Sequence, residues 1–403
     1  MEIHGNQRPD DPPADQVESE RLLAFAELAL NNGSPAEALD SFRQVDGPRA
    51  RSGEARALEA LGHDAQAADL HRALWDGAAP GSVERAEHAV GAVRCLGLCD
   101  ETTASVRFAE TALAEFGPSE SNSSEFDPSE FGPFEFDPSG PGPAGFGSTG
   151  YGAPRHPWHG AAVRLGVTLA GELADLGELQ RSRRLLNALG AIADRLGEPA
   201  ARGAVRWNAS LTAHLLGHPE EACRLSAQAL ALFGEADLPR HLAVVRGIHG
   251  RMLARAHPER WREALDLLLR AVAELTELGQ GAWLVDTETE VAEILVRAGR
   301  PDRAVPHLRA ALARPQRSES LVRADTHLVF AEALAALGDT EGCAAEVGAA
   351  AAILAPRRQR HSQLAREWHR AAALYRRLDS PAEAMRAYQR ALLAAGHLGP
   401  VWT

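Results

Sequence analysis

The chain has 403 residues, of which 45% are hydrophobic and only 5% aromatic, and it carries 55 acidic and 42 basic residues. Because the apolar residues are mostly alanine and leucine, the composition favours helices over sheets. The chain contains no lysine, so all 42 of these basic residues are arginines, which excludes a P-loop and a Schiff-base lysine. The formal charge of -13 falls mainly in residues 1–20 and 117–157, so the remainder lacks the basic surplus that phosphate binding requires.

Features of secretion, membrane insertion or metal binding are missing from the sequence. The four cysteines have no partner histidines or cysteines at the spacing of a metal site, so we interpret them as reduced, buried thiols. The N-terminus has no charged region followed by an apolar run, and no window approaches 18 uninterrupted apolar residues. We therefore expect a cytoplasmic protein without a metal or cofactor.

The clearest pattern lies near the end of the chain, at residues 368–391 (WHRAAALYRRLDSPAEAMRAYQRA). Large residues and alanines recur at spacings of three or four on two stripes, which a break at Ser380-Pro381 separates. The stripes consist of Trp368, Ala372 and Tyr375, and then Ala384, Tyr388 and Ala391. Such stripes predict two antiparallel helices that pack across a tight turn. The stretch resembles the tetratricopeptide repeat (TPR).

Most of the chain can be divided into degenerate copies of this unit, and the resemblance implies an all-α solenoid of about nine antiparallel helix pairs with a right-handed superhelical twist. We expect a disordered acidic segment at 1–16, repeats one to three at 17–116, a disordered insertion at 117–157, and repeats four to nine at 158–400. The insertion is acidic, rich in glycine, proline and phenylalanine, and contains EFDPS twice. It is either a tolerated expansion of a surface loop or a short binding element.

The resemblance also implies which residues line the concave groove, because the first helix of each repeat faces it. In repeats five to seven these are Trp207, Asn208, Arg251, Arg255, Glu290, Glu293 and Arg297. An asparagine amide can pair with a peptide backbone, arginines spaced by four suit a carboxylate or phosphate, and a tryptophan supplies an apolar anchor. These residues predict a groove for an extended peptide. The alternative is that the arginines pair with neighbouring acids and Trp207 belongs to the core.

No motif in the sequence predicts catalysis, since HExxH, GxSxG and a GxGxxG that opens a strand–helix unit are all missing. We therefore expect a protein that binds a protein or peptide partner and is not an enzyme. The main hypothesis is a regulatory sensor or adaptor. The alternative is a constitutive scaffold that assembles a cytosolic complex and uses the phenylalanine-rich insertion as a second binding element.

A narrower resemblance rests on stretches such as RLLAFAELALNNGSPAEAL and RWNASLTAHLLGHPEEACRLSAQALALFGE. They are similar to the repeat region of bacterial transcriptional regulators that join an N-terminal helix-turn-helix to a long TPR array. This resemblance implies that the array senses a peptide or small molecule and forms a homodimer. Only about 16 residues precede the first repeat, so we expect no direct nucleic-acid binding by this chain.

Overall fold

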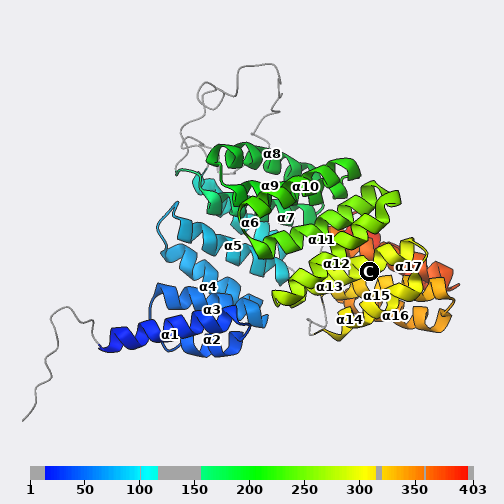
Figure 1. Ribbon diagram of the computed structural model, residues 1–403, viewed down its shortest axis with the longest axis horizontal. Helices are drawn as coiled ribbons and strands as arrows, with labels where there is room; N and C mark the ends of the chain where they lie inside the picture. The colour runs from blue at the N-terminus through cyan, green and yellow to red at the C-terminus, as the bar shows by residue number, and fades with distance from the viewer. Residues whose placement is uncertain (1–13, 100, 117–155, 315–319, 358–359, 398–403) are drawn as a thin grey trace, which may run out of the picture. The chain divides into compact units, whose positions relative to one another are not determined.

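The computed structural model describes residues 14–99, 101–116, 156–314, 320–357 and 360–397. Within these ranges every regular element is a helix and none is a strand, so the protein is all-α. Almost every helix packs against the next one along the chain (Figure 1). The predicted TPR-like solenoid is therefore confirmed. No helix in the same ranges has the length and apolar character of a membrane span.

The helices form two compact units, Met1–Glu101 (unit 1) and Thr102–Thr403 (unit 2), which we describe separately. Unit 1 contains α1 (Ala14–Asn31), α2 (Pro35–Phe42), α3 (Pro48–Leu61), α4 (Asp64–Gly77) and α5 (Val83–Leu98). Helix α1 thus begins three residues before the predicted start of the first repeat. Most of the predicted N-terminal segment and nearly all of the predicted insertion at 117–157 lie outside the described residues.

Unit 2 holds the remaining helices, which again follow one another as packed neighbours. They are α6 (Thr102–Leu113), the short 3-10 helix η1 (Ala114–Phe116), α7 (Gly160–Asp175), α8 (Leu179–Leu196), α9 (Pro199–Leu215), α10 (Pro219–Glu235), α11 (Pro239–Ala256), the 3-10 helix η3 (Pro258–Arg260), α12 (Trp261–Glu277), α13 (Gly281–Arg297), α14 (Pro301–Ala313), α15 (Leu321–Leu337), α16 (Thr340–Leu354), α17 (Ser362–Arg377) and α18 (Pro381–Ala394). We call α7, α9, α11, α13, α15 and α17 the inner helices; each is the first member of its pair.

A recurring turn joins the two helices of a pair, and the sequence specifies it. After α13, Gly299 has a φ of 71°, a left-handed conformation that glycine adopts without steric cost. The amides of Gly299 and Arg300 donate to carbonyls near the end of α13 at 3.0 and 2.8 Å. Pro301 then begins α14, where its missing N–H has no intrahelical partner to lose. In the last pair Asp379 takes the left-handed role, with a φ of 51°, before Pro381.

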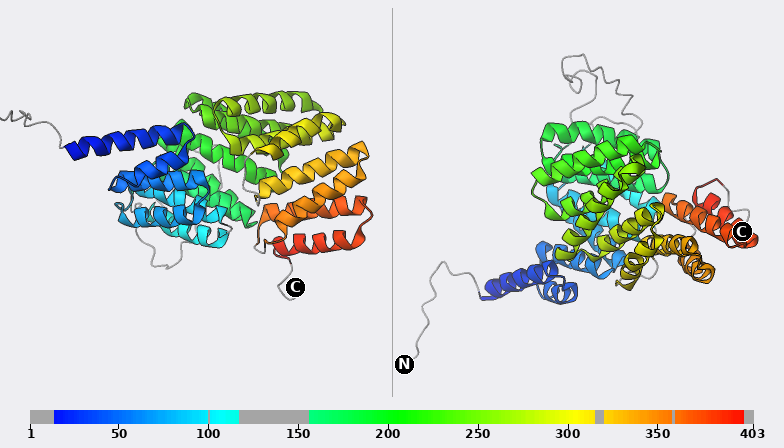
Figure 2. Two further views of the ribbon diagram at one scale, coloured as in Figure 1. Left: turned by 90° about the horizontal axis from the view of Figure 1, so that it is seen from below. Right: turned by 45° about the vertical axis from the view of Figure 1, so that its right-hand side comes forward.

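The last pair, α17 and α18, confirms the stripes that the sequence predicts. Trp368 is 5% exposed and packs in one cluster with Ala372 and Ala391, which let the helices approach closely. Tyr375 and Tyr388 pack against the edge of this cluster. Figure 2 shows α15–α18, orange to red, as helices lying side by side.

Close packing in unit 1 leads to a first prediction. A Cβ atom at Gly53 of α3 would lie 2.2 Å from Cε1 of the buried Phe42 ring of α2. We expect Gly53→Ala to lower the free energy of unfolding of unit 1 by about 1–2 kcal/mol, because the ring must shift in a close-packed core. Gly77→Ala, in α4, would meet no atom within 4 Å and should be neutral or stabilising by up to about 1 kcal/mol. Urea unfolding followed by circular dichroism measures both, and equal effects would contradict the close contact.

Candidate functional site

The predicted groove residues lie on the inner helices α9, α11 and α13. The predicted residues of α11 are four apart and those of α13 are three or four apart, so the residues of each helix lie on one face of it. The structure brings these two sets together: Nη1 of Arg251 lies 2.8 Å from Oε1 of Glu290, and Nη2 of Arg255 lies 3.2 Å from Oε2 of Glu293. Nη2 of Arg297 lies 2.6 Å from the other oxygen of Glu293. The arginines therefore pair with neighbouring acids, which was the alternative drawn from the sequence.

These ion pairs are largely enclosed, and enclosure changes the titration of the carboxyl groups. Glu290 and Glu293 are each 8% exposed. Burial raises the pKa of Glu290 to about 7, although the charge of Arg251 acts in the opposite direction. Burial also acts to raise the pKa of Glu293, but the charges of Arg255 and Arg297 outweigh it and the pKa is lowered. Near neutral pH, α13 therefore presents a carboxylate beside a carboxyl group that is protonated in part of the molecules.

The same arrangement continues onto the inner helices α15 and α17, whose charged residues the sequence analysis did not identify. Arg370 forms ion pairs with Asp325, with Glu332 at 3.1 Å and with Glu367 at 3.5 Å. Burial, with the charge of Asp325 adding to it, raises the pKa of Glu367 to about 8. Burial also raises the pKa of Asp325. These residues extend the charged face of α11 and α13 across two further helices.

Ion-pair partners on successive inner helices stand about one repeat apart in the sequence. The separation is 39 residues for Arg251 and Glu290 and 38 residues for Arg370 and Glu332. Equivalent positions of stacked repeats lie side by side, so an arginine and an acid separated by one repeat length predict a contact. This spacing is the sequence signal from which the pairs of α15 and α17 could have been found.

The charged residues also reach α7, because the end of α7 contacts α17 within unit 2 although the two are far apart in the chain. Burial raises the pKa of Asp175, against the charges of His361 and Arg366. Burial, with the charge of Asp175, raises the pKa of Glu172 to about 8. We call the connected charged residues of α7, α11, α13, α15 and α17 the inner charge network. Its members are Glu172, Asp175, Arg251, Arg255, Asp286, Glu290, Glu293, Arg297, Asp325, Glu332, Arg366, Glu367 and Arg370.

The two predicted residues of α9 have different surroundings. Trp207 is half-buried and packs against Phe233 and Trp283, with ring centroids 6.3 and 6.0 Å apart. Its position is therefore that of a core residue. Nδ2 of Asn208 donates to the carbonyl of Ala204 at 3.1 Å, one turn earlier in α9. Among the described residues, no hydrogen bond or ion pair joins Trp207 or Asn208 to the inner charge network.

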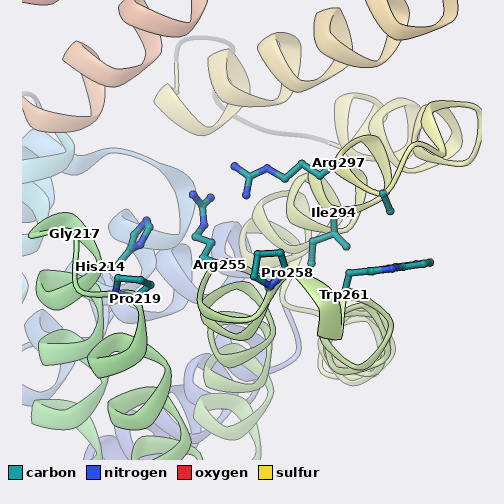
Figure 3. A pocket seen from close by; sticks show the side chains of 10 residues that line it. His214, Gly217, Pro219, Arg255, Pro258, Trp261, Ile294 and Arg297 are labelled. Atoms are coloured by element: carbon teal, nitrogen blue, oxygen red, sulfur yellow. The ribbon is translucent and has the colours of Figure 1, made fainter.

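A pocket of about 440 Å³ adjoins the network where α9, α11 and α13 end. Its apolar wall is formed mainly by Pro219, Pro258, Trp261 and Ile294. Figure 3 shows the guanidinium groups of Arg255 and Arg297 on the side of the pocket that also holds the imidazole of His214. The sequence analysis predicted both arginines for the groove but did not predict His214 or Trp261 for a site. Trp261 begins α12, which is not an inner helix, and no motif marks His214.

The described residues contain no group of three or more His, Cys, Asp or Glu side chains placed to hold a metal ion. All four cysteines are free thiols. The arrangement in unit 2 is therefore one of ion pairs and hydrogen-bonding groups, and its chemistry suits the binding of a polar ligand.

Solved structures with the same fold include three that align over most of this chain. The Rap protein complexed with competence and sporulation factor aligns over 93% of this chain and 97% of its own, at 11% identity and a TM-score of 0.54. NprR in complex with its cognate peptide NprX aligns over 97% and 91%, at 12% identity and a TM-score of 0.52. Aspartyl phosphate phosphatase F from Bacillus subtilis aligns over 99% and 100%, at 11% identity and a TM-score of 0.50. No family model and no curated protein matches the sequence. The chain therefore shares the TPR-like fold of these proteins.

Proposed function

We propose that the protein is a non-catalytic regulatory or adaptor protein whose inner charge network binds a peptide or an extended segment of a partner protein. The observation that carries this proposal is the enclosure of charged side chains on the inner helices. Replacing buried ion pairs by apolar side chains of similar volume is often neutral or stabilising, so stability does not account for a network of this size. Recognition of a polar ligand does account for it.

A peptide suits this network because its backbone supplies N–H donors and C=O acceptors at regular intervals. Arginine can only donate hydrogen bonds, whereas a carboxyl group with a raised pKa can donate or accept. Glu367 is 4% exposed, and its Oε2 atom accepts no hydrogen bond from any residue that the structure describes. The Oδ1 atom of Asn208 likewise accepts none within these residues. The Oε2 atom of Glu367 is enclosed beside Arg370 at 3.5 Å, whereas Asn208 is half-buried and its Oδ1 atom can accept from the N–H group of a bound peptide.

The structural likeness supports this proposal at the level of the fold. NprR holds its cognate peptide, and the Rap protein holds competence and sporulation factor. We extend the proposal to a cytoplasmic location, which the four free thiols support because disulfides are rare in reducing compartments. Direct contact with nucleic acid is not part of the proposed function.

An mRNA-displayed library of random peptides provides a test, with selection against the full chain. We expect a selected peptide to bind the Arg251→Gln/Glu290→Gln double variant about tenfold or more weakly than the wild type. The double substitution removes an ion pair without leaving a lone buried charge, so the fold should be retained. Affinity is measured by fluorescence anisotropy, and circular dichroism checks the fold.

The matched control is Arg183→Gln/Glu221→Gln, which removes an ion pair of 3.2 Å between α8 and α10, outside the inner charge network. The selected peptide should bind this variant as tightly as the wild type. Failure to select any peptide, or equal loss of affinity in both double variants, would contradict peptide binding at the network.

A further inference from the structure

The pocket at the ends of α9, α11 and α13 combines two kinds of surface. One side is apolar and is built from proline, alanine, isoleucine and the ring of Trp261. The other side carries Arg255, Arg297 and His214. A volume of about 440 Å³ with a mostly apolar wall and a few convergent polar groups is typical of a site for a small ligand or for one end of a larger ligand.

The three basic side chains each stand in the last turn of their helix. Helix C-termini carry a partial negative charge, so a cation in the last turn is favourable on its own. This effect explains one basic residue in each helix. It does not explain why the three side chains line one cavity with an apolar wall, because a solvent-exposed cation would also interact favourably with a helix C-terminus.

The arginines retain unused hydrogen-bonding capacity. Arg255 reaches Glu293 through Nη2, and the ion pair of Arg297 with the same carboxylate also uses Nη2. The structure gives no hydrogen bond from Nε or Nη1 of either arginine to any residue it describes. The two guanidinium groups share the Glu293 carboxylate, and Nη2 of Arg255 also lies 3.9 Å from Oε2 of Glu290. The remaining N–H groups of both arginines can therefore donate to an anionic oxygen of a ligand.

His214 adds a neutral hydrogen-bonding group beside the arginines. Burial, with the charge of Arg255, lowers the pKa of His214 to about 4, so the imidazole is uncharged at neutral pH. It forms no hydrogen bond to the described parts of the chain. One ring nitrogen can therefore donate to an anionic oxygen that enters the pocket.

We infer that this pocket binds an apolar carboxylate, with the carboxylate on Arg255 and Arg297 and the apolar body against Pro219, Pro258 and Trp261. The inference rests on the proposed function, because both arginines belong to the inner charge network, and it names the chemistry of one end of the ligand. Two sources offer this chemistry: the last residue of a peptide, and a free small apolar acid. Both ligands would place a carboxylate on the arginines and an apolar group on the opposite wall, so the probes below are chosen to distinguish them.

Isothermal titration calorimetry on the full chain tests the inference with three probes: N-acetyl-Ala-Ala-Leu with a free carboxylate, the same peptide as its C-terminal amide, and N-acetyl-leucine. We expect the free acid to bind about tenfold or more tightly than the amide, since a hydrogen-bonded charge pair is lost. Comparable affinities of N-acetyl-leucine and the acid peptide would identify a small acid as the ligand. Much tighter binding of the acid peptide would identify a peptide terminus.

Variants locate the binding. Arg297→Gln removes a guanidinium whose side chain is 56% exposed, so the fold should be retained, and affinity for the acid should fall about tenfold. Ala298→Phe fills the pocket from its wall and should abolish binding. The control is Arg183→Gln, which removes the arginine that pairs with Glu221 outside the pocket and should leave the affinity unchanged.

Equal binding of acid and amide, no binding of any probe, or unchanged affinity in both pocket variants would overturn the inference. The proposed function would survive such a result if displayed peptides still bound, because their C-termini are joined to the nucleic acid and offer no free carboxylate. Loss of displayed-peptide binding as well would overturn both.

Discussion

Arg370→Met is expected to lower the free energy of unfolding of unit 2 by about 3–5 kcal/mol at pH 7.5. The guanidinium of Arg370 pairs with Asp325, Glu332 and Glu367 from α15 and α17. Methionine keeps most of the side-chain length but removes the charge, so three carboxyl groups would lose their shared ion-pair partner and only the charge of Arg366 would oppose their repulsion. Hydrogen exchange of the amides in α15 and α17 measures the change in opening free energy.

Acid should partly rescue this variant. Without Arg370, the pKa of Glu367 should rise above its value of about 8, because the larger of the two arginine charges that oppose the effect of burial is gone. At pH 5.5 the stranded carboxyl groups take up protons, so we expect the loss to fall to about half. A loss that does not depend on pH would show that packing, and not charge, is responsible.

The control for Arg370→Met is Arg386→Met on α18. Arg386 pairs with Glu383 at 2.7 Å, and the two side chains are 65% and 44% exposed. A surface pair of this kind contributes little, so its loss should change stability by less than about 0.5 kcal/mol. If Arg370→Met were as mild as Arg386→Met, the inner charge network would not depend on balanced charge.

The fold was predictable from the sequence because its determinants are local. The alanine and aromatic stripes of residues 368–391 and the left-handed residue followed by proline lie within one helix pair, and each specifies the same turn. Helix limits were less predictable. Helix α1 continues back to Ala14 through a polar segment, where the sequence has no apolar stripe to mark the start.

The site was only partly predictable because its contacts join different repeats. Arg251 and Arg255 could be placed on one helix face, but their enclosure depends on α13 and on the acids one repeat later. The approach of α7 to α17 arises from small rotations that accumulate over several repeats, so no single repeat encodes it. The assignment of Trp207 required knowledge of its neighbours, since a tryptophan on an inner helix fits a groove and a core equally well.

The two units are expected to respond to pH in opposite directions. In unit 2, burial raises the pKa values of Glu172 and Glu367 to about 8 and that of Glu290 to about 7. Between about pH 4.5 and 8 these carboxyl groups therefore hold more protons in the folded unit than in the unfolded chain. Burial lowers the pKa values of His214, His241 and His249, which offsets part of this difference only below about pH 6.5. The stability of unit 2 therefore falls as the pH rises from about 6.5 through the folded pKa values of the carboxyl groups. We expect a loss of about 2–4 kcal/mol from pH 6 to pH 8.5.

Unit 1 has the opposite arrangement, around two buried histidines. Nδ1 of His71 lies 3.3 Å from Nδ1 of His88, and both residues are buried. Burial, with the charge of His71, lowers the pKa of His88. The unfolded chain then binds a proton near pH 6.5 that the folded unit does not, so stability falls as pH falls below about 6.5. Glu59 acts in the same direction at lower pH: burial opposes its ionisation, but the hydrogen bond to His71 and the charge of Arg94 lower its pKa to about 2.

Hydrogen exchange between pH 5.5 and 8.5, corrected for the intrinsic exchange rate, reports the two units separately. Amides of α13–α17 should become more protected as the pH falls, and amides of α3–α5 less protected. Glu367→Gln should reduce the slope of unit 2 by about a third and leave that of unit 1 unchanged, because an amide does not titrate while Glu172 and Glu290 still do. If both units lost protection in the same direction, or if the slope of unit 2 were the same in Glu367→Gln as in the wild type, the protons of the inner charge network would not control its stability. If protection instead changes in opposite directions in the two units, the carboxyl groups of the inner charge network hold protons near neutral pH. A ligand that displaces those protons should then bind more tightly as the pH rises, which peptide titrations at two pH values can detect.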